Sequence, residues 1–113
     1  MLTNYVYNPK NCVTKKNAYR ILNDILNYYK PQGTNSRLNK STMAAPLQVV
    51  FSNIDNKGRA NFKAKRITLN LDLIQSYEEL THVIAHELFH INDSIFDDKR
   101  EQRAHNFAKL WVK

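Results

Sequence analysis

The stretch from Ser76 to Asp93 constrains the fold of this chain more than any other part of its sequence. Ser76 followed by Glu79 is the pattern of a capping box, in which the two side chains bind free backbone N–H groups at the start of a helix. We therefore expect a helix that begins there, ends near Asn92 and Asp93, and buries one apolar stripe. The residues at helical spacing that form this stripe are Leu80, Val83, Ile84, Leu88 and Ile91.

A neighbouring face of the same helix carries His86, Glu87 and His90, which read His-Glu-x-x-His. Residues four apart lie about 6 Å from each other on one helix face, so both imidazoles can bind one zinc ion. In this pattern the glutamate is the general base of a zinc-dependent peptidase. The plainer alternative is that the histidines are surface or core residues and that Glu87 is a solvated acid.

A catalytic zinc ion takes three protein ligands and keeps a position for water. Asp93 is a less suitable third ligand, because it follows His90 by only three residues and the ion would still lie beside the same helix turn. Glu101 is preferred because a separate helix can turn its carboxylate back to the ion. The alternative for Glu101 is a capping box with Asp98 at the N-cap. The candidate third ligands are Asp93, Asp97, Asp98, Glu101 and His105.

Three further residues are candidates for supporting roles. His105, one turn after Glu101, is an alternative ligand, a group that orients a ligand, or a hydrogen-bond donor to the transition state. His82 lies one turn before His86. It can be a partly buried histidine with ordinary hydrogen bonds as well as a catalytic residue. Tyr77 is a third candidate for stabilising an oxyanion.

The rest of the chain predicts an α+β fold. Thr14 is a candidate N-cap for an amphipathic helix over residues 15–30, with Pro31 and Gly33 as its stop. Its apolar positions are Ala18, Ile21, Leu22, Ile25, Leu26 and Tyr29. Residues 31–46 are mostly polar or turn-prone and predict a loop.

Three alternating segments follow this loop, at residues 47–51, 60–64 and 66–71, with turn chemistry at residues 55–58. They predict a small antiparallel sheet with one buried face, to which the third strand contributes Ile67, Leu69 and Leu71. A last helix from about Lys99 directs four residues towards the core: Ala104, Phe107, Ala108 and Trp111.

Length and charge bound the organisation of the chain. At 113 residues it fits a single domain over residues 1–113, with a basic N-terminal helical region at 1–46 and a catalytic core at 47–113. The net charge is +7, and residues 1–43 hold seven Lys/Arg against one acid, Asp24. Such a region can meet a nucleic acid or an acidic protein, or be merely solvated. No nucleic-acid-binding motif accompanies it.

A cytoplasmic protein is expected. The sequence has no run of about 18 apolar residues that would span a membrane, and its start lacks the plan of a signal peptide. The one cysteine, Cys12, cannot form an internal disulfide, which agrees with a reducing compartment. We expect no membrane partner.

Residues 66–112 resemble the gluzincin group of metallopeptidases, most closely the ImmA/IrrE-like family and the minigluzincins. The resemblance lies in the strand Ile67-Thr68-Leu69-Asn70, in Ala85-His86-Glu87-Leu88-Phe89-His90, and in Glu101-Gln102-Arg103-Ala104-His105-Asn106-Phe107-Ala108. The family's last segment typically reads Glu, two residues, Ala-Asn, one residue, Phe-Ala. Here His105 replaces the usual Asn and Phe89 a frequent Gly. Residues 1–46 show no such resemblance.

The resemblance implies a minimal zincin-like domain and one Zn²⁺ held by His86, His90 and Glu101, with Glu87 as the general base. Relatives of this kind are implicated in cleaving transcriptional repressors. We expect an extended protein or peptide substrate to pair with an exposed edge strand near residues 66–71. The alternative function is a non-catalytic zincin-like module that binds nucleic acid or an acidic protein through its basic N-terminal half.

Overall fold

The computed structural model of the chain describes residues 9–29, 47–93 and 95–112. Within them the fold is α+β, with three α-helices and a three-stranded mixed sheet. The elements in chain order are η1 (Pro9–Cys12), α2 (Lys15–Tyr29), β1 (Gln48–Phe51), β2 (Gly58–Asn61), β3 (Arg66–Leu69), η2 (Leu71–Leu73), α4 (Tyr77–Asn92) and α5 (Arg100–Lys109). The predicted loop at 31–46 lies outside the described residues.

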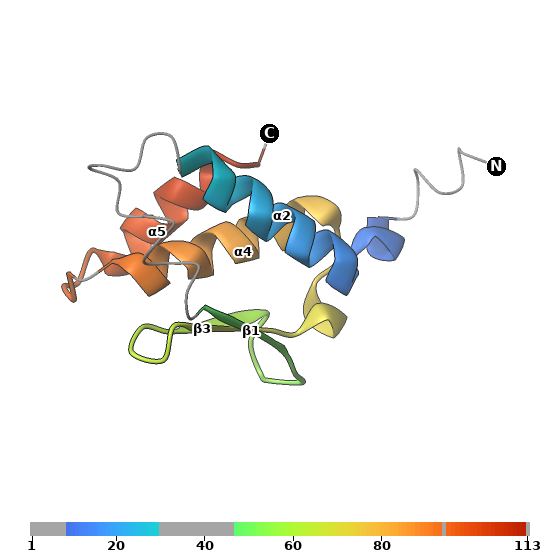
Figure 1. Ribbon diagram of the computed structural model, residues 1–113, viewed down its shortest axis with the longest axis horizontal. Helices are drawn as coiled ribbons and strands as arrows, with labels where there is room; N and C mark the ends of the chain where they lie inside the picture. The colour runs from blue at the N-terminus through green and yellow to red at the C-terminus, as the bar shows by residue number, and fades with distance from the viewer. Residues whose placement is uncertain (1–8, 30–46, 94, 113) are drawn as a thin grey trace.

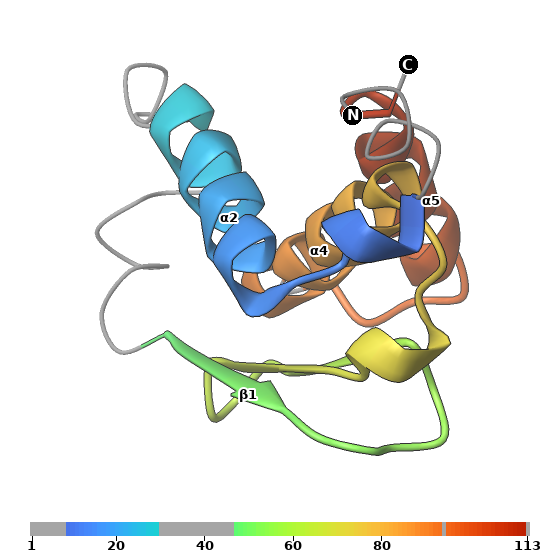
Figure 2. The ribbon, with the colours of Figure 1, turned by 90° about the vertical axis from the view of Figure 1, so that its right-hand side faces the viewer.

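The molecule has two layers, with the helices on one face of the sheet (Figures 1 and 2). Helix α4 lies between α2 and α5 and also contacts β2 and β3. The core fills the space around α4 and includes Ile25 of α2, Ile67 and Leu69 of β3, and Phe107 of α5. The buried side chains of α4 are therefore packed against α2, α5 and the sheet.

The predicted helix around the histidines is confirmed as α4, and all five residues of its expected apolar stripe are buried. Ser76 Oγ accepts a hydrogen bond from the Glu79 backbone N–H at 3.0 Å. Glu79 Oε1 accepts from the backbone N–H of Gln75 at 2.7 Å, one residue before the partner that a standard capping box uses. The other Glu79 oxygen pairs with Lys57 and thereby ties the start of α4 to the segment before β2.

The other two helices also follow the sequence prediction. Thr14 Oγ1 accepts a hydrogen bond from Asn17 N–H at 3.1 Å and caps α2, whose buried residues are Ala18, Ile21, Leu22, Ile25 and Leu26. In α5 the residues Ala104, Phe107 and Ala108 are buried. Trp111 follows the end of this helix and packs against the core.

The expectation of an antiparallel sheet is wrong for one of the two strand pairs. The strand order is β1-β3-β2, with β2 antiparallel and β1 parallel to β3. The cause is the segment between β1 and β2, which crosses the end of β3 rather than forming a hairpin. Asn70 holds it there, since its side chain donates to Ile54 O at 2.7 Å and its backbone N–H donates to Lys57 O at 3.0 Å.

The same topology shows that the predicted free edge at residues 66–71 is also wrong. β3 ends at Leu69 and is the central strand, paired on both sides. Leu71 belongs to η2 instead of the strand. Among the described residues, the edges of the sheet are β1 and β2.

The second strand is displaced from the predicted residues 60–64 to Gly58–Asn61. Residues 62–65 form the turn to β3, in which Asn61 Oδ1 accepts a hydrogen bond from Ala64 N–H at 3.0 Å and Lys65 has a φ of 53°. Short polar side chains that bind nearby backbone N–H groups stabilise turns. The alternating pattern of Phe62 to Ala64 is therefore overridden by local hydrogen bonding.

Among the described residues, no helix has the length and apolar character needed to cross a membrane.

One residue of the basic N-terminal region has an internal role. Lys10 Nζ donates hydrogen bonds to the carbonyl groups of Leu71, Asp72 and Ile74, and so joins η1 to η2.

Candidate metal centre

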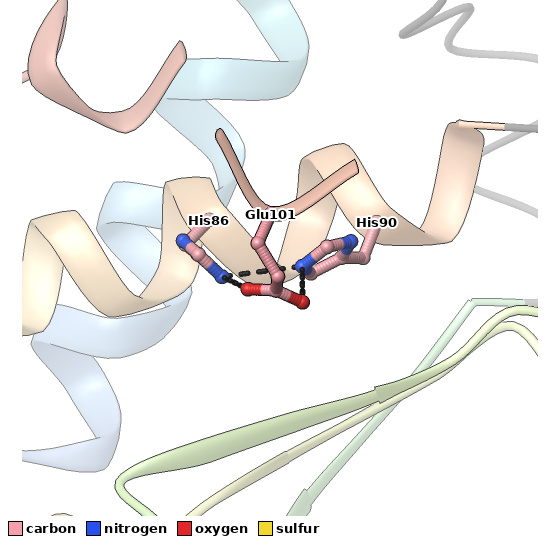
Figure 3. Close-up of side chains that lie close together, drawn as sticks. All are labelled: His86, His90 and Glu101. Atoms are coloured by element: carbon pink, nitrogen blue, oxygen red, sulfur yellow. Dashed lines mark hydrogen bonds and ion pairs between the residues drawn. The ribbon is translucent and has the colours of Figure 1, made fainter. Parts of the chain in front are cut away.

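Three side chains predicted as ligands converge between α4 and α5. His86 and His90 project from consecutive turns of α4 towards Glu101, the second residue of α5 (Figure 3). The two Nε2 atoms are 3.1 Å apart. The Glu101 oxygens lie 3.1 Å from His86 Nε2 and 3.0 Å from His90 Nε2. This arrangement can hold a metal ion.

The donor set fits a small tetrahedral cation. Nitrogen and oxygen ligands at about 2.1 Å from such an ion lie about 3.4 Å from one another, close to the separations seen here. Nε2 of His90 is the ring atom that faces the other two side chains, whereas its Nδ1 is buried without a hydrogen-bond partner among the described residues. Little movement is therefore needed for all three groups to bind one ion.

The directions in which the pKa values of His86 and Glu101 shift also suit a bound cation. Burial, and then the charge of His90, lowers the pKa of His86. Burial by itself raises the pKa of Glu101, but the charges and hydrogen bonds of His90 and His86 outweigh it and bring the pKa below its ordinary value. A neutral imidazole and an ionised carboxylate are the forms that bind metals.

Glu87 lies beside this group, under strand β2. Its position is shown by Gly58, where an added Cβ would stand 3.1 Å from Glu87 Cγ and 3.3 Å from Glu87 Oε2. Burial, and then the negative charge of Glu101, raises the pKa of Glu87 to about 7. A carboxyl group with a pKa near neutrality can both accept and return a proton.

Arg100 joins the end of α4 to the start of α5. Its guanidinium group donates to His90 O at 2.9 Å and to Asp93 O at 2.5 Å. These carbonyl groups lie at the C-terminus of α4, where the helix leaves acceptors without internal partners. Because Arg100 precedes Glu101 directly, the same contacts bring the carboxylate of Glu101 to the histidines.

Asp93, another candidate for the third ligand, is bound to Arg103 and does not belong to the group formed by His86, His90 and Glu101. Its side chain is fully buried and accepts hydrogen bonds from Arg103 Nε at 3.1 Å and Nη2 at 2.9 Å. Burial by itself raises the pKa of Asp93, but hydrogen bonds from Ile95 N–H and Arg103 and the charge of Arg100 lower it overall. This ion pair holds α5 against the end of α4.

The remaining acidic candidates, Asp97 and Asp98, do not belong to the group of possible ligands found among the described residues. Asp97 accepts hydrogen bonds from Arg103 and from the Lys99 backbone N–H, and it is exposed. The capping box proposed for Asp98 and Glu101 does not form. The N-cap of α5 is Lys99, which makes no side-chain capping bond.

His82 and His105 lie beside the ligand group but contact each other, with ring centroids 5.1 Å apart. Burial, and then the charge of His105, lowers the pKa of His82. Tyr77 is the first residue of α4, nine residues before His86 and so about 13 Å away along the helix axis. It packs against the core, so the structure does not bring it to the ligands.

A cleft of about 390 Å³ opens onto the ligand group. Its lining residues are Asn56, Gly58, Arg59, Ala60, His86, Glu87, His90, Arg100 and Glu101. The contribution of β2 was missed by sequence reasoning, although Gly58 carried a signal for it. Glycine within a strand often marks a close approach by another backbone or a ligand.

Replacing Gly58 by alanine is expected to destabilise the protein by about 1–3 kcal/mol, the usual cost of overpacking. The new Cβ would lie only 2.6 Å from Val83 Cγ1, and valine is stiff about χ1. Urea denaturation followed by circular dichroism measures the change. Arg59→Ala is the control because this neighbouring strand residue is exposed; equal stability of Gly58→Ala and wild type would contradict the described packing of β2 on α4.

Comparisons of the chain with family models, with curated proteins and with solved structures found no match.

Proposed function

We propose that this protein is a zinc-dependent metallopeptidase that hydrolyses peptide bonds. The observation that carries the proposal is the convergence of His86, His90 and Glu101, with Glu87 in the same cleft. Two imidazoles and one carboxylate form a ligand set of catalytic zinc sites that leaves a position open. We infer that Zn²⁺ is the ion held here.

Bound zinc supplies a Lewis acid, which polarises a peptide carbonyl and lowers the pKa of water towards about 7. The protein provides the proton transfers. Glu87 accepts a proton from the attacking water and delivers it to the leaving amine. Its burial against Gly58 keeps the carboxyl group within the cleft.

The free edge of β2 is the proposed binding surface for an extended substrate. Asn70 N–H donates to Lys57 O, and hydrogen-bonded and non-hydrogen-bonded pairs alternate along an antiparallel ladder. In the register of β2 with β3, the backbone N–H and C=O groups of Gly58 and Ala60 therefore point away from β3. Both residues line the cleft, so a peptide added to this edge runs past Glu87.

The resemblance to ImmA/IrrE-like peptidases and minigluzincins supports the same proposal. The resemblance extends the proposal to a zincin-like fold and to a specific protein substrate such as a transcriptional repressor. The central position of β3 changes one part of that expectation, because the edge strand that lines the cleft is β2.

The test compares the zinc-loaded full chain with its Glu87→Gln variant on unfolded protein and mixed peptide substrates. Hydrolysis is expected to fall by about 100- to 10,000-fold, the usual contribution of a general base. Zinc content should equal that of wild type, since Glu87 is not one of the proposed ligands. Mass spectrometry of the products and elemental analysis provide the two measurements.

Glu78→Gln is the matched control because Glu78 is an exposed acid in the first turn of the same helix. It should retain full activity and zinc. If wild type and Glu87→Gln bind zinc and behave identically with every substrate, the peptidase proposal fails. The non-catalytic binding module would then be the better explanation.

A further inference from the structure

The four histidines of this chain lie in one row along the α4–α5 contact. Three of them, His82, His86 and His90, follow one another at intervals of one turn on α4, and His105 adjoins the row from α5. The ring centroids are 4.7 Å apart for His86 and His90, 6.1 Å for His82 and His86, and 5.1 Å for His82 and His105. Only half of the row belongs to the proposed zinc site.

The His82–His105 pair has nearly the same ring geometry as the pair in the zinc site. Its planes meet at 65°, compared with 74° for His86 and His90. Imidazoles that bind one tetrahedral ion through nitrogens at about 2.0–2.1 Å place their ring centres about 5 Å apart. Both histidine pairs are close to this separation.

The surroundings of the pair permit a bound cation. His82 and His105 are each half-buried, so their rings are held by packing but reach solvent. The charges of Glu79 and Lys109 both act on the His82 ring, with opposite signs. Glu79 is engaged with Lys57 and Gln75, and water can supply the further ligands of an ion.

We propose that His82 and His105 form a second metal site, one that takes a nitrogen-preferring divalent ion such as Zn²⁺, Ni²⁺ or Cu²⁺. Imidazole pairs favour these ions over Mg²⁺ and Ca²⁺, which prefer oxygen ligands. The site has two protein ligands and binds more weakly than the group of His86, His90 and Glu101. An ion here links α4 to α5 one helical turn from Glu101.

The experiment uses Zn²⁺ as the probe and the metal-stripped full chain. Isothermal titration calorimetry is expected to show one tight ion and one weaker ion per chain. Nitrogen-detected NMR of the histidine rings then identifies the weaker site. The signals of His82 and His105 should shift together during the second equivalent, after those of His86 and His90 have finished shifting.

Four variants separate the two sites. His82→Asn and His105→Asn should each remove the weaker ion and leave the tight one. Lys109→Gln should strengthen the weaker ion several-fold, because it removes a positive charge that acts on His82. His90→Asn should remove only the tight ion, so failure of the second site is distinguishable from failure of the peptidase proposal.

The proposal is overturned if wild type binds no more than one zinc ion per chain when the zinc concentration is millimolar. It is equally overturned if a second equivalent shifts neither His82 nor His105 in the NMR spectrum of wild type. This measurement requires no substitution, so it remains decisive if a histidine variant fails to fold.

Discussion

His90→Ala is expected to lower zinc affinity by more than about 100-fold, beyond the usual cost of losing a residue that merely orients a ligand. His90 is buried, and its Nε2 lies 3.1 Å from His86 Nε2 and 3.0 Å from Glu101. The buried acid nearest in sequence, Asp93, is not free to replace it because Asp93 is bound to Arg103. Competition with a chromophoric zinc chelator measures the loss. Glu101→Ala should act in the same direction, since it removes the carboxylate of the proposed ligand set.

His105→Ala is the control that separates the ligand group from its neighbours. His105 contacts His82 and belongs to the opposite end of the histidine row, so its replacement should leave the tight zinc ion in place. Loss of this ion in His105→Ala, with retention in Glu101→Ala, would contradict the assignment of Glu101 as the third ligand. The outcome is read from the same competition assay.

Asp93→Ala is expected to destabilise the folded protein by about 3 kcal/mol, the lower range for removal of one partner from a buried ion pair. The substitution leaves Arg103 without its two hydrogen bonds to Asp93, although Arg103 still pairs with Asp97 and reaches solvent. It also releases the end of α5 that carries Glu101. Zinc affinity should therefore fall together with stability, as measured by chelator competition and urea denaturation.

Asp97→Ala is the matched control, because it removes an exposed carboxylate that binds the same arginine. Exposed ion pairs contribute little, so its stability should equal that of wild type.

The folded state lowers the pKa of Asp93, so the unfolded chain takes up a proton first as the pH falls. The stability difference between wild type and Asp93→Ala should be complete at neutral pH and shrink in acid below the ordinary carboxyl pKa; a difference independent of pH would contradict this account.

The helices were predictable because their signals are local. Ser76 caps α4 and Thr14 caps α2 through hydrogen bonds that span three residues. The apolar spacing of each helix identifies the buried face without reference to its neighbours. Similarly, the spacing of His86 and His90 places both on one face of the helix, whatever elements pack against that helix.

The sheet was less predictable because strand pairing depends on contacts far apart in the sequence. The alternating segments indicate strands but not which of them are neighbours. Here Asn70 binds both Ile54 and Lys57, which directs the chain across the end of β3 and leaves β2 at the edge. Nothing in the separate strand patterns distinguishes this order from a simple meander.

The sequence by itself determined a capped helix with two histidines and a glutamate on one side. Only the tertiary structure decided which acid completes the group. Five candidates followed His90, and the burial of Asp93 with Arg103, together with the contacts of Arg100 at the end of α4, selected Glu101. Helix periodicity acts within a few residues of the chain, whereas the position of Glu101 depends on how a second helix packs against the first.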